Sequence, residues 1–220
     1  MLMYLPTSFA EERPEVLADL IARHPLGLLL TTEDGGGIQA SHLPLLFQPA
    51  TAGTPALLRG HLALANPHGR TLDGATALVV FQGPNAYISP SNYPSKQRDP
   101  RHVPTWNYAV VHVRGRVRVV TEAPALLAIV DQLSNEFERE RAEPWSLAQA
   151  PRAYVDNLLR GIIGIELTVT SLQGKWKMSQ NRLAEDAAGV AAALRSAPSE
   201  HAREVSQLVE EALLRRTPTK

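Results

Sequence analysis

The stretch from Val111 to Val120 constrains the fold more strongly than any other part of the chain. Small apolar residues occupy every second position, and histidine or arginine stands between them. Because successive side chains of a β-strand point to opposite faces, this pattern predicts a half-buried strand with a basic outer row. The apolar positions are Val111, Val113, Gly115, Val117 and Val119, and the polar positions are His112, Arg114, Arg116 and Arg118.

Other segments repeat the same signals, with strands in the middle of the chain and helices near its ends. A turn signal of acidic and glycine residues at 33–37 separates two predicted arms of a β-hairpin, and Ser199 is predicted to cap the last helix. This order predicts a mainly β, α+β fold: a closed antiparallel β-barrel decorated by helices. The predicted strands are 26–32, 38–47, 56–62, 75–82, 111–120 and 163–169, and the predicted helices are 14–24, 124–140, 152–159 and the region from 183 onward.

Residues 81–108 form the second informative stretch. They include five of the twelve aromatic residues, several prolines and one lysine, Lys96. A connecting loop is usually shorter and richer in Gly, Asn and Asp. Because prolines fix φ, this segment loses little chain entropy when it orders, and it is predicted to present flat rings and polar groups to a flat ligand. The alternative is a loop that packs its aromatics on the barrel or on a partner subunit.

Composition excludes several classes of protein. The chain of 220 residues has no cysteine, which excludes disulfides, thiolate nucleophiles and cysteine-ligated metal sites. Basic and acidic residues balance at 22 each, so no overall charge attracts nucleic acid or an anionic membrane. No apolar run approaches the roughly 20 residues needed to span a bilayer, and no signal peptide is recognisable. A cytoplasmic protein is the expectation.

A dense group of polar side chains follows the last predicted strand, at 174–182. Two of the four lysines of the chain, Lys175 and Lys177, flank Trp176 here, close to serine, glutamine, asparagine and arginine donors. Phosphate is bound by several convergent donors, so this segment is a candidate anion site. The alternative is a solvated strand end. Two smaller polar clusters lie at 40–44 and 60–68.

Common catalytic and nucleotide-binding motifs are absent. The chain has no Gly-x-Gly-x-x-Gly sequence, no P-loop and no Gly-x-Ser-x-Gly elbow, and its histidines lack metal-ligand spacing. No metal site and no catalytic acid or base is predicted. The arginine row at 114–118 is interpreted as a solvated strand face more readily than as a DNA-backbone stripe, and 124–159 fits a helix-turn-helix poorly.

Long motifs spread over residues 3–195 resemble the PaiB-type family of FMN-binding negative transcriptional regulators. The resemblance is carried by short, closely matching segments with proline, histidine, lysine and tryptophan at their centres. These segments are 3–6 (MYLP), 41–46 (SHLPLL), 60–61 (GH), 65–67 (ANP), 81–84 (FQGP), 87–90 (YISP), 93–96 (YPSK), 103–108 (VPTWNY), 164–166 (GIE) and 175–182 (KWKMSQNR).

The resemblance implies an FMN-binding split β-barrel, similar to pyridoxamine-phosphate oxidases and flavin reductases, that forms a homodimer with flavin sites at the interface. Together with the helical pattern after Pro198, which lies past the matched motifs, this predicts one domain over 1–197, with peripheral helices, followed by a C-terminal helix over 198–220. The cofactor contacts that it implies are His61, Asn66, Lys96, Trp106, Lys177 and Arg182, followed by Ser41, His42, Thr105, Asn107, Ser179 and Gln180.

Three functions follow as hypotheses. The first is a transcriptional regulator that acts through flavin or small-molecule binding, with direct DNA contact disfavoured by the zero net charge. The second is an FMN-dependent oxidoreductase similar to NAD(P)H:flavin reductases, in which the cofactor performs the electron chemistry. The third is haem binding or degradation, with His42, His61 or His68 as iron ligands.

Overall fold

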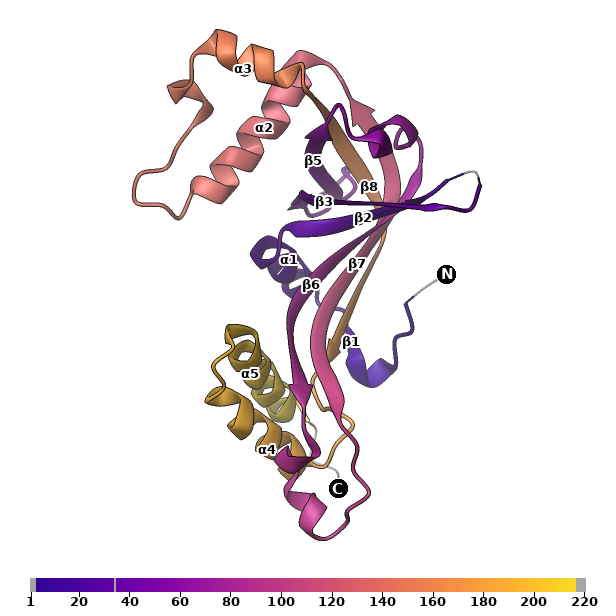
Figure 1. The fold of residues 1–220 in the computed structure, drawn as a ribbon, viewed down its shortest axis with the longest axis vertical. Coiled ribbons are helices and arrows are strands. Elements are labelled where there is room, and N and C mark those ends of the chain that lie inside the picture. Colours follow the sequence, from indigo (N-terminus) through magenta and orange to yellow (C-terminus); the bar gives the residue numbers. More distant parts are fainter. Residues whose placement is uncertain (1–2, 34, 217–220) are drawn as a thin grey trace. The chain divides into compact units, whose positions relative to one another are not determined.

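The computed structural model describes residues 3–33 and 35–216, and these residues form one antiparallel sheet with flanking helices (Figure 1). Residues 1–2, 34 and 217–220 lie outside the described residues. They belong to the start of the predicted domain 1–197, to the predicted hairpin turn and to the end of the predicted C-terminal helix. The strands are β1 (Ala10–Glu11), β2 (Leu26–Thr32), β3 (Ile38–Pro44), β4 (Leu46–Gln48), β5 (Leu57–Ala63), β6 (Thr76–Ile88), β7 (Thr105–Val120) and β8 (Ile162–Lys177), and the α-helices are α1 (Pro14–Arg23), α2 (Ala123–Glu138), α3 (Arg152–Leu159), α4 (Ala184–Arg195) and α5 (Glu200–Leu214).

The strand order is β3-β2-β6-β7-β8-β5-β4, with β1 paired to β8. The β2–β3 hairpin is in register from Leu26 opposite Pro44 to Thr32 opposite Ile38. The sheet curls, because β3 also lies against β5. Gly60 of β5 permits this approach, since a Cβ there would lie 2.8 Å from the carbonyl oxygen of Pro44. The antiparallel, curled sheet with flanking helices agrees with the split-barrel fold expected from the sequence.

The residues divide into two compact units, and β6, β7 and β8 each contribute to both. The first unit contains the chain up to Leu17, Gln82–Val111 and everything from Gln173 onward. The second contains Ala18–Phe81 and His112–Leu172. In the second unit, α2 contacts β5 and α3, and a buried apolar cluster lies beneath them. The members of this cluster are Val120, Leu126, Ile129, Leu133, Val155 and Leu159.

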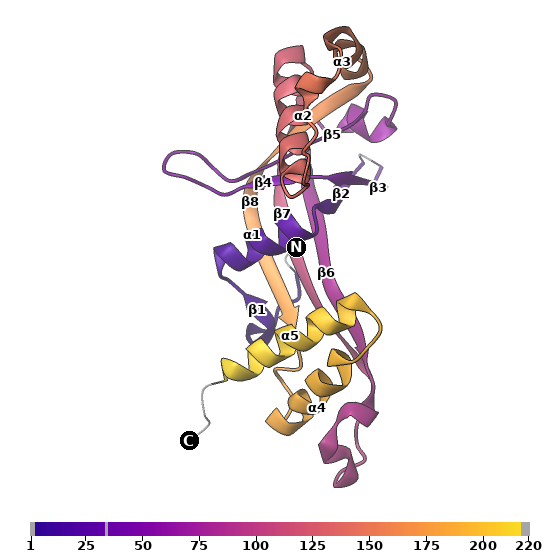
Figure 2. The same ribbon diagram turned by 90° about the vertical axis from the view of Figure 1, so that its left-hand side faces the viewer.

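In the first unit, α4 and α5 lie side by side in both views (Figure 1 and Figure 2). Their apolar faces bury Val190, Leu194, Val205 and Val209. Ser199 caps α5 as expected, because its hydroxyl accepts a hydrogen bond from the backbone N–H of Ala202 at 3.4 Å. The same unit places α4 against the short helical turns that follow β6. Among the helices of the described residues, none has the length and apolar character needed to cross a membrane.

Three of the sequence expectations need correction. The aromatic segment at 81–108 is not one long loop, because β6 continues to Ile88 and β7 begins at Thr105. Phe81 and Tyr93 are core residues, with 0 % and 2 % of their surfaces exposed, whereas Tyr87 and Trp106 are exposed. The arm predicted over 38–47 divides into β3 and β4. In β7 the alternation also slips at its end, where Val119 is half-buried and Val120 is buried.

Candidate functional site

Two lysines at the end of β8 begin the strongest candidate site, which belongs to the first unit. Lys175 and Lys177 are two residues apart on a strand, so they point to the same face. The ammonium group of Lys175 is buried, donates to the carbonyl oxygen of Tyr4 at 3.0 Å and lies 5.2 Å and 5.5 Å from the ring centroids of Tyr4 and Tyr108. The ammonium group of Lys177 donates to the hydroxyl of Thr105 at 2.5 Å.

The charges of this group are uncompensated. Burial lowers the pKa of Lys177, and the positive charges of Lys175 and Arg182 lower it further. Across residues 3–33 and 35–216, no carboxylate forms an ion pair with any of these three cations. Three neighbouring cations without acidic partners repel one another, and a bound anion would relieve that repulsion. We call Lys175, Lys177 and Arg182 the cation cluster.

The turn after β8 connects the two lysines to Arg182 and has an unusual backbone. Ser179 has φ 61°, a left-handed conformation that costs a residue other than glycine about 1–3 kcal/mol. Side chains stabilise it from both sides: Asn107 donates to the Ser179 hydroxyl at 2.9 Å, and Gln180 bonds the backbone of Met178 and of Trp176 at 2.6 Å each. Strained residues that the surroundings hold in place cluster at binding sites, and here the strain lies between Lys177 and Arg182.

Arg182 lies against an aromatic ring instead of a carboxylate. Its guanidinium lies 5.0 Å from the centroid of the buried Tyr93 ring. Burial raises the pKa of Tyr93, and the charge of Arg182 opposes that rise. The loop that carries Tyr93 is itself fixed to α4, because Asp186 accepts hydrogen bonds from the backbone N–H of Ser95 at 3.0 Å and from its hydroxyl at 2.7 Å. The loop and the helix therefore form one supported frame for Arg182.

Lys96 and Trp106, two further predicted contacts of the first unit, are both exposed. Lys96 lines an open groove of about 680 Å³ between its short helical turn and α4. Trp106 is 52 % exposed and packs edge-to-face against Tyr87, with ring centroids 6.1 Å apart and planes at 71°. An exposed aromatic pair of this kind offers flat apolar surface to a ligand or a protein partner.

In the second unit, His68 is the centre of a buried polar group. Its Nε2 lies 2.8 Å from the Thr31 hydroxyl and its Nδ1 lies 2.9 Å from the Ser41 hydroxyl, so both ring nitrogens are engaged. Asn66 caps the following short helix through the N–H of His68 and also donates to Ser41 at 3.1 Å. Because neither nitrogen of His68 is free, this histidine does not suit the haem-ligand role that the sequence suggested for it.

The other two histidines proposed from the sequence differ from His68. His42 is exposed on β3, and the Nδ1 atom of His61 on β5 is buried without a hydrogen-bond partner. No group of three or more His, Asp or Glu side chains suited to a metal ion occurs in the described part of the chain. Of the three histidines proposed from the sequence, His61 is thus the one with a buried ring nitrogen that a ligand could satisfy.

Because His61 and His68 are shielded from solvent, we expect the protein to lose stability in mild acid. Burial lowers the pKa of His61 and of His68 from the usual 6.5. Below pH 6.5 the unfolded chain binds protons that the folded chain does not, so the free energy of unfolding falls as the pH falls. Urea midpoints measured at about pH 7.5 and about pH 5.5 give the size of this loss, and His61→Gln should make the difference between the two midpoints smaller. Equal midpoints at the two pH values would contradict the prediction.

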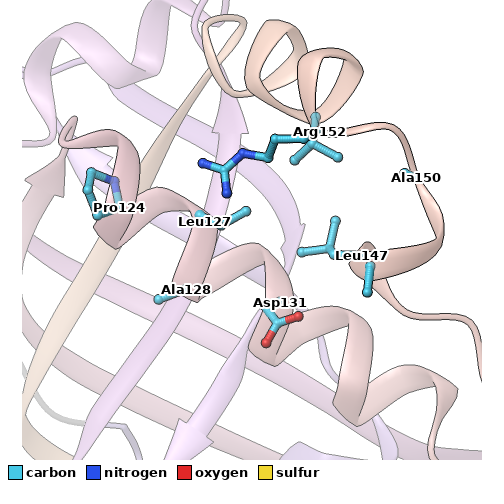
Figure 3. A pocket seen from close by; sticks show the side chains of 9 residues that line it. Pro124, Leu127, Ala128, Asp131, Leu147, Ala150 and Arg152 are labelled. Atoms are coloured by element: carbon cyan, nitrogen blue, oxygen red, sulfur yellow. The ribbon is translucent and has the colours of Figure 1, made fainter.

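A separate cavity of about 430 Å³ lies between α2 and α3 (Figure 3). Its lining is mainly apolar and includes Pro124, Leu127 and Leu147. Its two charged residues are engaged elsewhere, because Arg152 donates to Asp156 of its own helix at 2.8 Å and Asp131 accepts from Asn135 of its own helix at 3.1 Å. The cavity therefore offers a ligand mainly apolar surface and two charged side chains, each already bonded within its own helix.

The structure thus divides the twelve predicted contacts between the two units and adds residues that the sequence reasoning missed. Ser41, His42, His61 and Asn66 belong to the second unit, and the other eight belong to the first. Four residues are absent from the twelve contacts: Lys175, which the sequence analysis placed only in the candidate anion segment; His68, which it named only as an iron ligand; and Tyr108 and Thr31. The two-residue spacing of Lys175 and Lys177 on a strand was a signal for the first of these. The contacts of Tyr108 and Thr31 depend on tertiary structure and left no such signal.

Comparison with known proteins identifies the family. A family model described as "Putative FMN-binding domain" matches residues 3–171, more than three quarters of the chain. The chain belongs to this family. It is also 32 % identical over 212 residues to the "Protease synthase and sporulation protein PAI 2" of Bacillus subtilis (strain 168), covering 96 % of this chain and 98 % of that protein. The expected PaiB-type family and its FMN cofactor are thereby confirmed.

Solved structures confirm the fold. A FAD- and haem-binding protein from Mycobacterium smegmatis matches with a TM-score of 0.56 and 19 % identity, covering 76 % of this chain and 73 % of that one. The flavocytochrome Anf3 of Azotobacter vinelandii matches with a TM-score of 0.54 and 11 % identity, covering 76 % and 69 %. At these identities the matches show a shared split-barrel fold.

The residues of the first unit fit the FMN cofactor of the family. FMN ends in a phosphate monoester, an anion that needs convergent charged and hydroxyl donors. The cation cluster and the hydroxyl of Thr105 supply such donors, and no neighbouring carboxylate of the described chain neutralises them. The family model ends at residue 171, so Lys175, Lys177 and Arg182 lie beyond the part that it matches.

Proposed function

We propose that this protein is an FMN-binding regulator of transcription that binds the FMN phosphate with its cation cluster and acts through its flavin. The observation that carries the proposal is the presence of Lys175, Lys177 and Arg182 together without acidic partners. The regulatory part is supported by the name of the Bacillus subtilis relative, a sporulation protein. Direct binding of DNA is not required by this account.

Within this proposal, the residues of the first unit have distinct roles. Lys177 and Arg182 donate to the phosphate, and Thr105 orients the Lys177 ammonium group through their 2.5 Å hydrogen bond. Asn107, Ser179 and Gln180 hold the turn between the two cations. Bound FMN supplies one- and two-electron chemistry. The contribution of the protein is to bind and orient the cofactor and to exclude water from its phosphate.

The other predicted contacts stay predictions on this account. Lys96 and Trp106 are proposed as further cofactor contacts in the first unit. Ser41, His42, His61 and Asn66 are proposed as contacts from the second unit. His61 is favoured within this group because its buried Nδ1 atom has no partner in the structure.

The arginine row of β7 supports an indirect regulatory role more than direct DNA binding. Arg118 is bonded to Glu166 at 2.6 Å, and the same carboxylate accepts from Arg59 at 2.8 Å. Their charges hold the pKa of Glu166 below its usual value, against the effect of burial, so Glu166 remains ionised and neutralises part of the row. The chain as a whole carries no net charge. Both observations argue against a surface built to neutralise phosphates of DNA.

Assembly into a homodimer is part of the proposal. The exposed pair of Tyr87 and Trp106 is the kind of aromatic surface that is enriched at protein interfaces. Analytical ultracentrifugation should give the mass of two chains, and Trp106→Ala should shift the equilibrium toward one. A monomer at micromolar concentration would contradict this part of the proposal.

The regulatory role can be tested in cells. Deletion of the gene should change the level of specific transcripts, and the wild-type gene should restore them. The Lys177→Met/Arg182→Ala double variant should fail to restore them, because it is expected to lose FMN. Unchanged transcripts on deletion would contradict regulation, and full restoration by the double variant would contradict dependence on the flavin.

A second assay distinguishes this role from the alternatives. We expect no shift of DNA fragments at about 50 mM salt, whereas a DNA-binding protein would shift them with an affinity that falls steeply toward 200 mM. Steady oxidation of NAD(P)H by the FMN-loaded protein would instead support the oxidoreductase. A Soret band that survives gel filtration after haem is added, and disappears in His61→Ala, would support haem binding.

A further inference from the structure

The end of α5 is tied to the turn that lies between the two phosphate-binding side chains. Arg216, which follows α5, donates from Nη2 to the carbonyl oxygen of Ser179 and from Nη1 to that of Arg182, each at 3.0 Å. The turn is closed by a third bond, from the N–H of Arg182 to the same Ser179 oxygen, at 3.0 Å. One guanidinium therefore bonds both ends of the turn.

The planar guanidinium is suited to this arrangement. Its N–H groups are fixed in a fork, so one arginine can bond two separate carbonyl oxygens, whereas a lysine ammonium group acts as a single compact donor. The positive charge of Arg216 offsets the partial negative charge of the carbonyl oxygens of Ser179 and Arg182, to which it donates. The left-handed Ser179 is also held in place from a segment 37 residues further along the chain.

The preceding arginine fixes the strand before the turn. Arg215 lies 3.7 Å from the carboxylate of Glu11, which Arg13 also bonds. Glu11 belongs to β1, and it pairs there with Gly174, next to Lys175. Arg216 therefore bonds the end of the segment 174–182 directly, and Arg215 contacts its start only through Glu11; neither arginine is among the twelve predicted contacts.

We propose that Arg216 is a positioning residue for the anion site, which holds the Ser179–Arg182 turn in the shape that presents Lys177 and Arg182 to a phosphate monoester. The inference rests on the proposed role of the cation cluster in binding the FMN phosphate. It assigns a binding function to the end of the C-terminal helix, beyond the residues matched by the family model.

The test compares binding of FMN and of riboflavin, which lacks the phosphate, by flavin fluorescence. Arg216→Ala should raise the Kd for FMN about tenfold, equivalent to about 1.4 kcal/mol, and leave the Kd for riboflavin unchanged. Arg203→Ala is the matched control, because Arg203 likewise donates to two backbone carbonyl oxygens, of Ala197 and Pro198, at 2.9 Å and 2.8 Å but away from the cation cluster. It should change neither affinity.

Arg216→Lys separates positioning from simple attraction by charge. This variant keeps the positive charge but lacks the forked donor geometry. If Arg216 positions the turn, the Kd for FMN should also rise, by roughly threefold to tenfold; if Arg216 only attracts the anion by its charge, the Kd should not change. Wild-type affinity for FMN in both Arg216 variants would overturn the inference. An equal loss of affinity for FMN and for riboflavin in these variants would overturn it as well. If Arg216→Ala fails to fold, Arg216→Lys decides. A wild-type protein that binds FMN no better than riboflavin would instead contradict the proposed phosphate role itself.

Discussion

Replacing Lys177 with methionine should raise the Kd for FMN about a hundredfold while leaving the Kd for riboflavin unchanged. The half-buried ammonium group belongs to the cation cluster, none of whose three members forms an ion pair with a carboxylate of the described chain, and Thr105 holds it in place. A charge-assisted hydrogen bond to a buried anion contributes about 1.5–3 kcal/mol, so its loss should cost one to two orders of magnitude. Titration followed by flavin fluorescence measures both constants.

Two further variants complete this experiment. Arg182→Ala should have a similar effect, because it removes the second phosphate donor, although the two losses will not add in full. Arg116→Ala is the control: it removes an exposed positive charge from β7 in the second unit and should change neither constant. Equal losses of FMN and riboflavin in Lys177→Met would contradict the phosphate role of Lys177.

Replacing Asp186 with alanine should lower the free energy of unfolding by about 3 kcal/mol. Its buried carboxylate accepts two hydrogen bonds from Ser95, and 1 % of its surface is exposed. Its removal leaves a buried N–H and a buried hydroxyl without this acceptor and detaches the loop at 89–104 from α4. Urea unfolding measures the loss, and limited proteolysis should show faster cleavage within that loop.

The adjacent Glu185 provides the matched control. It forms an ion pair with Arg98, and both side chains are exposed, so Glu185→Ala should leave the urea midpoint nearly unchanged. A midpoint for Asp186→Ala as close to wild type as that of Glu185→Ala would show that Asp186 does not secure the loop.

The sequence predicted elements well wherever periodicity was strong. The strand at 26–32 and the helix at 152–159 have the predicted bounds, and Ser199 caps its helix. The loop predicted from the prolines and polar residues of 81–108 was wrong at its two ends, because β6 extends to Ile88 and β7 begins at Thr105. The strands continue there because Phe81 and Ile88 pack in the core, and this burial depends on tertiary structure that local sequence does not record.

The candidate site was predictable in part. The density of donors at 175–182 indicated an anion site, and the structure adds the absence of acidic partners among the described residues. The role of Arg216 could not be predicted, because its partners are 34 and 37 residues away in the chain. His68 was one of several histidines in the sequence, and only the fold places hydroxyl groups at both of its ring nitrogens.

The most direct test of the central claim is a titration of the flavin-free protein with FMN and, in parallel, with riboflavin. The account predicts saturable FMN binding at micromolar or lower Kd, one FMN per chain, and weaker binding of riboflavin because the cation cluster would then lack its anion. Failure to bind FMN, or equal affinity for the two flavins, would contradict the claim that Lys175, Lys177 and Arg182 form the phosphate site.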